Sequence, residues 1–99
     1  MSELLDDHDA TGLAALVREG QVHPRELVDE AIARIERVDP HLNAVIHRQF
    51  ERARHEAGGP LPDGPFRGVP FLLKDFNGAE RGEPHHQGMR ALRDARWIA

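Results

Sequence analysis

Only two short stretches of this 99-residue sequence have the apolar character of β-strands, and this scarcity limits the folds that are open to it. One is 43–46, and the other is 69–73, which holds Pro70 near its start. Proline usually confines a strand to a sheet edge or to its first residues, and a two-stranded sheet is barely stable alone. The pattern therefore predicts that a partner or a further part of a protein completes the sheet.

The segment before residue 40 predicts two helices. Asp9 or Thr11 can cap the first, in which Leu13, Leu16 and Val17 share one face. Proline is well accepted in the first turn of a helix, so residue 24 is expected to open the second, which runs to about residue 38. There the pair Asp39-Pro40 is expected to end the helix.

The remainder predicts two more helices separated by loops. Residues 47–57 place Phe50, Ala53 and Ala57 in line, and residues 58–68 are rich in glycine and proline, as loops are. After the apolar stretch 69–73, residues 76–88 form a second loop, and 89–98 is a candidate last helix. The order helix, helix, strand, helix, strand, loop, helix favours an α/β fold. Residues 1–8 are expected to be flexible.

Composition excludes several classes of protein. The net charge is -4 and acidic residues are interspersed with basic ones, so no basic stripe for nucleic acid is present. Cysteine is absent, which excludes disulfides and thiolate metal sites and fits a cytoplasmic protein. No apolar run approaches the ~20 residues of a membrane span, and the acidic start has no apolar core of a signal peptide. We therefore expect neither nucleic acid nor membrane as a partner.

Lys74 is the only lysine, whereas the other twelve basic residues are arginine. A desolvated lysine can lose its proton and act as a base in nucleophilic catalysis, which arginine cannot. The alternative is a solvated lysine that pairs with Asp75 or another carboxylate. Ser2 and Thr11 are the only hydroxyl residues, because tyrosine is absent too, so a base at residue 74 has no evident nucleophile to activate.

The seven histidines do not predict a metal site. No two of them stand four residues apart, and adjacent histidines tend to point apart, so surface positions are the simpler interpretation. They are His8, His23, His41, His47, His55, His85 and His86. The glycines at 78, 82 and 88 do not form a phosphate loop either. We expect neither a metal nor a cofactor.

The stretch from Gly64 to Asp75, with its Gly-Val-Pro-Phe-x-x-Lys-Asp core, closely resembles the first conserved block of the amidase signature family. Residues 9–20, 24–36 and 42–45 support the resemblance. Residues 88–92 look like the corresponding segment in bacterial amidases of the aminohexanoate cyclic-dimer hydrolase type. The resemblance covers roughly residues 9–99.

This resemblance implies the amidase signature fold, a large mixed sheet wrapped by helices, with 1–99 as a truncated amino-terminal portion of a single domain. It also implies hydrolysis of carboxamides or cyclic amides by a serine nucleophile, a second serine with a cis peptide bond, and a lysine base. Lys74 stands at the position of that lysine, and Asp75 at that of a supporting residue that orients the adjacent loop or pairs with a nearby charge. The serines belong to a later segment that this chain lacks, so the chain alone is expected to be inactive.

Two alternatives remain open. The chain could be a non-catalytic fragment that acts as an interaction module. It could also belong to the glutaminase subunit of a tRNA-dependent amidotransferase, which shares the signature. The run from His85 to Met89 departs from the small hydroxyl residues that this subunit carries near residue 88. A small amide is the expected substrate, and a homo-oligomer is possible.

Overall fold

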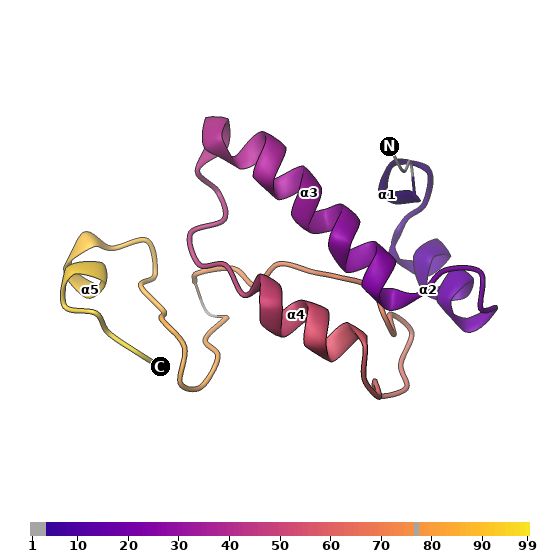
Figure 1. Ribbon diagram of the computed structural model, residues 1–99. Coiled ribbons are helices and arrows are strands. Elements are labelled where there is room, and N and C mark those ends of the chain that lie inside the picture. Colours follow the sequence, from indigo (N-terminus) through magenta and orange to yellow (C-terminus); the bar gives the residue numbers. More distant parts are fainter. Residues whose placement is uncertain (1–3, 77) are drawn as a thin grey trace.

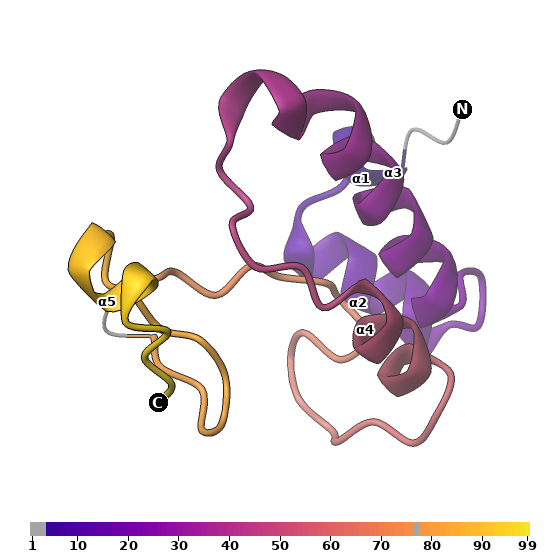
Figure 2. The same ribbon diagram turned by 60° about the vertical axis from the view of Figure 1, so that its left-hand side comes forward.

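The computed structural model describes residues 4–76 and 78–99, and over these ranges the fold is helical. The helices are α1 (Leu4–Asp7), α2 (Ala10–Arg18), α3 (Pro24–Leu42), α4 (Phe50–Ala57) and α5 (Arg90–Asp94). Figures 1 and 2 show α1, α2 and α4 gathered around the long helix α3, whereas α5 and the C-terminus stand to one side. The radius of gyration is 15.0 Å, above the about 13 Å of a compact chain of this length. The molecule is therefore elongated.

Helix α2 confirms the first predicted helix, including its cap. The Asp9 side chain accepts a hydrogen bond of 2.8 Å from the backbone N–H of Gly12. Such a bond satisfies one of the N–H groups that the first turn of a helix leaves without a partner. Leu13 and Ala14 are buried, and Gly20 takes the left-handed conformation just after the helix. The apolar spacing of the sequence thus sets the buried face.

Helix α3 begins at Pro24 as predicted, but the predicted end at Asp39-Pro40 is wrong, because the helix continues to Leu42. A proline inside a helix removes one hydrogen bond and crowds the carbonyl four residues earlier, but only two helical residues follow Pro40, so little of the helix depends on the lost bond. The helix ends where Asn43 turns left-handed (φ 51°) and donates its N–H to the Asp39 carbonyl at 2.7 Å. That conformation is a common C-terminal cap, so asparagine and not proline ends the helix.

Two small clusters form the core. Leu13, Val22 and Leu27 make the first, against which partly buried side chains pack: Leu4, Leu5, Leu16, Val17 and Val69. The second lies between α3 and α4 and consists of Val28, Ile32 and Ala57, with Phe50 and Ala53 alongside. Leu27 is fully buried at the first cluster. The apolar residues that the sequence aligns in α2 and in α4 therefore lie in or against these clusters.

The two later helices are shorter than predicted. Helix α4 begins at Phe50, three residues after the predicted start, and α5 ends at Asp94 although the pattern runs to residue 98. Arg96 adopts a left-handed φ of 55°, and the N–H of Trp97 bonds back to the Leu92 carbonyl at 3.0 Å. The chain therefore turns away before a further helical turn can form.

The predicted strands 43–46 and 69–73 are not formed in the part of the chain that the structure describes. Neither stretch is assigned as a strand, Asn43 at the start of the first is left-handed, and the β-pairing described here is an isolated bridge between Pro84 and Ile98. An extended segment becomes a strand only when a neighbour hydrogen-bonds to it, and within 4–76 and 78–99 no such neighbour lies beside either stretch. Phe71, Leu72 and Leu73 are consequently exposed. The fold thus shows the helices of the predicted α/β arrangement without its sheet.

The first residues of the chain are only partly within the described ranges. Residues 1–3 lie outside them, and residues 4–7 form α1, whose Leu4 and Leu5 pack against the first core cluster. The flexibility expected for 1–8 stays a prediction. Among the described residues, no helix combines the length and apolar character needed to span a membrane.

Candidate functional site

The segment that carries Lys74 is attached to the helical body at its beginning. Gly68 has a φ of +84°, and a Cβ atom there would lie 3.0 Å from Pro24 Cγ and 3.1 Å from Val17 Cγ1. Val69 packs against the first core cluster. Glycine is needed here because it accepts the left-handed backbone and permits this close approach. The block Gly68-Val69 therefore fixes where the extended segment leaves the body.

Lys74 itself lies on an exposed stretch. No hydrogen bond or ion pair joins its side chain to another residue within 4–76 and 78–99. In particular, it does not pair with Asp75, which was one interpretation of the sequence, because that carboxylate is engaged elsewhere. Both the ammonium group and the preceding Phe71 to Leu73 face solvent.

The Asp75 carboxylate is held by the turn at residues 86–88. Oδ1 accepts a hydrogen bond of 2.7 Å from the backbone N–H of His86, and Oδ2 accepts one of 3.2 Å from that of Gly88. Burial pushes the pKa of Asp75 upward, but the N–H groups of His86, Gly88 and Gln87 and the charge of His85 outweigh it. The pKa of Asp75 therefore lies below its ordinary value.

His85 is buried beside this carboxylate, so the surface position expected for it is wrong. Only 6% of the residue is exposed, and its Nδ1 lies 3.5 Å from Asp75 Oδ1. At this distance the protonated ring forms an ion pair with the carboxylate. No periodicity or motif in the sequence signals this burial, because the partner of the ring lies ten residues earlier in a loop.

The chain also folds back closely on Lys74. An ideal Cβ atom at Gly78 would lie 2.6 Å from the Lys74 carbonyl oxygen and 3.2 Å from Leu73 Cγ. A distance of 2.6 Å is shorter than real Cβ contacts, so no side chain fits at residue 78 without a shift of the backbone. The Lys74 backbone is thus enclosed between Gly78 and the anchored Asp75.

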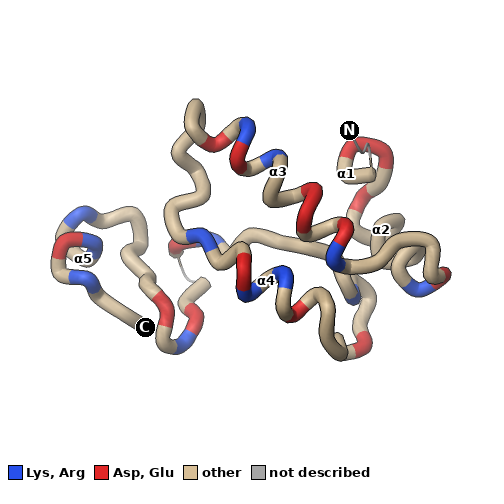
Figure 3. The backbone as a smooth tube through the Cα atoms, in the orientation of Figure 1, with Lys and Arg blue, Asp and Glu red and all other residues tan. Residues whose placement is uncertain are grey.

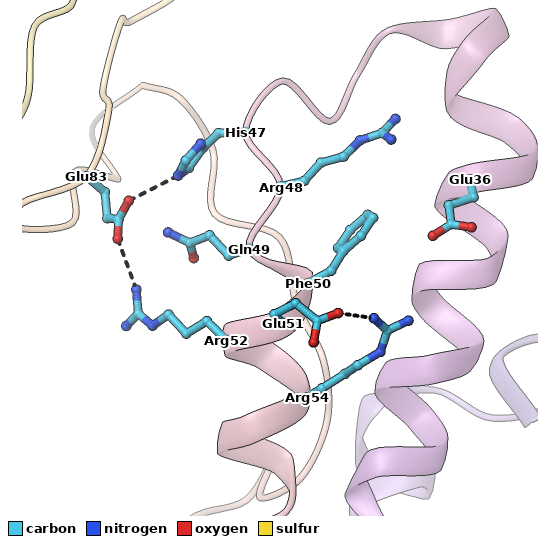
Figure 4. A pocket seen from close by; sticks show the side chains of 9 residues that line it. All are labelled: Glu36, His47, Arg48, Gln49, Phe50, Glu51, Arg52, Arg54 and Glu83. Atoms are coloured by element: carbon cyan, nitrogen blue, oxygen red, sulfur yellow. Dashed lines mark hydrogen bonds and ion pairs between the residues drawn. The ribbon is translucent and has the colours of Figure 1, made fainter.

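A groove of about 570 Å³ lies elsewhere, between the end of α3, the start of α4 and the loop near Glu83. In Figure 4, His47 and Arg52 point toward Glu83, and Glu51 pairs with Arg54. Its lining consists of Glu36, His47, Arg48, Gln49, Phe50, Glu51, Arg52, Arg54 and Glu83. Lys74 and Asp75 do not line it.

The groove carries little uncompensated charge. Arg52 pairs with Glu56 and with Glu80, Arg54 pairs with Asp29, and basic and acidic residues alternate along α3 and α4 in Figure 3. Paired guanidinium groups are less available to an anionic ligand than free ones. These contacts attach the loop at 80–83 to α4, and we assign the groove this structural role.

Asp39 is a buried polar residue that the sequence analysis missed. Its Oδ1 accepts from the N–H of Ala44 at 2.6 Å and of Val45 at 3.0 Å, and its Oδ2 pairs with Arg48 at 3.0 Å. The N–H of Val45 lowers the pKa of Asp39 most; burial opposes this, and Ala44 and Arg48 add to the lowering. Asp39 therefore shapes the connection between α3 and α4.

The described residues contain no group of three or more His, Asp or Glu side chains that could hold a metal ion. The candidate site therefore consists of Lys74 and Asp75, which the sequence singled out, together with the turn at residues 85–88. Its donors are backbone N–H groups and its acceptor is the Asp75 carboxylate, so the N–H groups of His86 and Gly88 are already occupied.

No family model matches the chain. The 6-aminohexanoate-cyclic-dimer hydrolase of Paenarthrobacter ureafaciens is 40% identical to it over 91 residues, which are 92% of this chain and 18% of that protein. A solved structure of 6-aminohexanoate cyclic dimer hydrolase superposes with a TM-score of 0.81 at 38% identity, over 93% of this chain and 19% of the other.

A second solved structure is that of a bacterial aryl acylamidase of the amidase signature enzymes, with a TM-score of 0.76 at 39% identity, over 93% of this chain and 20% of the other. This chain therefore spans about a fifth of the length of the proteins that it resembles. Identity at this level together with these TM-scores shows that the helical arrangement is shared with them.

Proposed function

This chain belongs to the amidase signature family along the stretch that it shares with these relatives, and from that premise we propose that it supplies the lysine base of an amidase. The reaction is hydrolysis of the carbon–nitrogen bond of a carboxamide or cyclic amide. The observation that carries the proposal is the position of Lys74. The only lysine of the chain closes the Gly64–Asp75 block, which the core holds at Gly68 and Val69.

In the proposed mechanism, neutral Lys74 accepts the proton of the serine nucleophile by way of a second serine whose peptide bond is cis, and the nucleophile attacks the amide carbon. The carbon–nitrogen bond then breaks, the amine leaves with that proton, and water hydrolyses the acyl–serine ester. A lysine base must be neutral, which requires burial or neighbouring hydrogen bonds to lower its pKa. Lys74 is exposed here, so we propose that further residues of a longer amidase cover it. The greater length of the relatives supports this proposal.

We further propose that the 99 residues are the amino-terminal portion of an amidase domain and have no amidase activity alone. Ser2 lies outside the described residues, and Thr11 is exposed at the start of α2. Neither residue has the Gly- and Ser-rich surroundings of the family's nucleophile. Loss of triad members leaves only weak residual catalysis, because the groups act as a unit.

A chimera tests the role of Lys74. The matching stretch of the Paenarthrobacter ureafaciens hydrolase would be replaced by residues 9–99, and turnover of 6-aminohexanoate cyclic dimer would be measured. Lys74→Arg keeps the charge but cannot deprotonate, so we expect kcat to fall about 10²- to 10⁴-fold, nearly as far as with Lys74→Ala. Arg90→Ala, at the exposed start of α5, is the control that should leave kcat unchanged.

Circular dichroism would establish that each chimera is folded before its kinetics are compared. An active chimera in which Lys74→Arg retains near-normal kcat would make Lys74 a structural cation and overturn the proposal. Amide turnover by the 99-residue chain alone, abolished by Lys74→Ala, would overturn the proposal that the chain is inactive without further residues.

A further inference from the structure

The turn that holds Asp75 has an unusual backbone. Gln87 (φ 52°) and Gly88 (φ 73°) are both left-handed, and the N–H of Met89 bonds to the His86 carbonyl at 2.9 Å to close the turn. Left-handed φ is uncommon for a residue other than glycine and needs support from its surroundings. The consequence is that the N–H groups of His86, Gln87 and Gly88 all point at the Asp75 carboxylate.

Successive backbone N–H groups that converge on one point form an anion-binding concavity, often called a nest. In many proteins a nest receives a phosphate or another ligand. In this chain the occupant is an internal carboxylate, at 2.7 Å from one N–H and 3.2 Å from another. Charge-assisted hydrogen bonds of this kind are about twice as strong as neutral ones. The filled nest therefore connects the residue next to Lys74 to a turn eleven to thirteen residues later.

We propose that Asp75 is a positioning residue for Lys74: its carboxylate fills the nest of the 86–88 turn and fixes the backbone of the lysine against that turn and the buried His85. This inference rests on the proposed function of Lys74. Asp75 touches neither a substrate nor a reacting atom in this role. It acts by holding the residue that follows Lys74, while Gly78 permits the chain to turn back close to the Lys74 carbonyl.

The geometry makes specific demands on residue 75. An asparagine carries no charge and has an NH₂ group in place of one oxygen, so in the observed geometry either the N–H of His86 or that of Gly88 would face a donor instead of an acceptor. A glutamate keeps the charge but is one methylene longer, so it must displace the turn to reach the same groups. We therefore expect Asp75→Glu to retain part of the function that Asp75→Asn loses.

The structural part of the proposal is tested by hydrogen exchange in the 99-residue chain, observed by NMR at a dilution where the chain is monomeric. In Asp75→Asn, exchange at the His86 and Gly88 amides should accelerate about tenfold or more, the equivalent of 1.4 kcal/mol or more, while the α2 and α3 amides stay unchanged. Asp63→Asn is the matched control, because its side chain is 97% exposed in the loop before Lys74. Unchanged exchange at His86 and Gly88 would overturn the proposal.

A measurement on the unsubstituted chain covers the case in which Asp75→Asn does not fold. The amide proton shifts of His86 and Gly88 should both follow one acid transition that coincides with the carboxyl carbon shift of Asp75. That transition should lie below the ordinary pKa of aspartate, since the N–H groups favour the charged carboxylate. Amide shifts that do not follow the carboxyl group would overturn the proposal.

The functional part is tested in the chimera. Misplacement of a reacting group by about 1 Å can cost about 10²-fold in rate, so Asp75→Asn should lower kcat by that order with little change in KM, and Asp75→Glu should recover part of it. If Lys74→Arg remains active while amide exchange at His86 and Gly88 depends on Asp75, the proposed function of Lys74 is wrong, but the binding of Asp75 to the 86–88 turn is confirmed. If Lys74 is essential but kcat is unchanged in Asp75→Asn, the positioning role is overturned.

Discussion

The carbonyl oxygen of Lys74 lies 2.6 Å from the point at which a side chain at Gly78 would begin. The lysine backbone is therefore bordered on one side by a residue that tolerates no Cβ atom. On the other side it is bordered by Asp75, whose carboxylate is bound to the 86–88 turn. These contacts define the backbone of Lys74 even though its side chain is exposed.

Gly78→Ala should destabilise the fold around Lys74. The added methyl group meets a backbone oxygen, which cannot rotate away as a side chain can, so the backbone must shift at a cost of about 1–3 kcal/mol. Gly64→Ala is the matched control, because nothing lies within 4 Å of its Cβ position. Urea unfolding of both variants checks this; equal stability would show that residue 78 has more room than its geometry implies.

Gly68→Ala should destabilise the fold for two reasons, backbone strain and crowding, and the variant Gly20→Ala separates them. The left-handed φ of +84° strains any residue with a Cβ atom by about 1–2 kcal/mol, and Pro24 and Val17 leave no space for it. Gly20 has a similar φ of +74° but nothing within 4 Å, so Gly20→Ala should cost the strain alone. In thermal unfolding, Gly68→Ala should have the lower Tm; a Tm equal to that of Gly20→Ala would contradict the crowding.

The helices could be predicted from the sequence because their causes are local. Apolar spacing, the Asp9 cap and the proline at residue 24 all act within a few residues, and the core clusters follow from them. The end predicted at Pro40 is wrong, because the effect of a proline on a helix depends on its position in that helix. The strands depend on a neighbour to pair with, which none of the described residues supplies for 69–73.

The candidate site was predictable only in part. Lys74 and Asp75 stand out by residue type and by resemblance to a family motif. The position of His85 and the binding of Asp75 to the 86–88 turn depend on loop conformations, including the left-handed φ of Gln87, that no periodicity signals. Asp39 was likewise missed, since its N–H partners follow it by five and six residues outside the helix.

The buried Asp39 carboxylate and the half-buried Asp75 carboxylate should make the stability of the fold depend on pH in the acid range. The folded-state pKa values of Asp39 and Asp75 lie below the ordinary ~3.9 of the unfolded chain. Their contribution is therefore fully present above that value and is lost as the pH falls through the folded-state pKa. We therefore expect the urea concentration at the midpoint of unfolding to decrease as the pH is lowered from about 6 to about 2.5, a range that includes the ordinary pKa of aspartate.

Asp39→Asn should flatten this acid dependence and lower the urea midpoint at neutral pH, since it loses the ion pair with Arg48. Asp7→Asn is the control, because Asp7 is exposed in α1, and it should leave the acid dependence and the urea midpoint at neutral pH nearly unchanged. A dependence as steep in Asp39→Asn as in the unsubstituted chain would contradict the assignment of Asp39.

The extended segment at 71–73 should make the 99-residue chain associate with itself. Phe71, Leu72 and Leu73 are 81%, 69% and 54% exposed, and their backbone groups have no β-ladder partner among the described residues. An exposed apolar segment without a pairing partner is a template for strand addition. We therefore expect sedimentation velocity to show larger species as concentration rises.

Leu72→Glu should weaken this association, because a charge in the segment opposes strand addition between like copies. Leu42→Glu is the matched control, since Leu42 is 66% exposed but lies at the end of α3, away from the extended segment. If segment 71–73 mediates association, only the first substitution should restore the monomer. Equal effects of the two substitutions would indicate unspecific apolar contact. If the unsubstituted chain is a monomer at all concentrations and unfolds cooperatively, the exposed segment does not drive association.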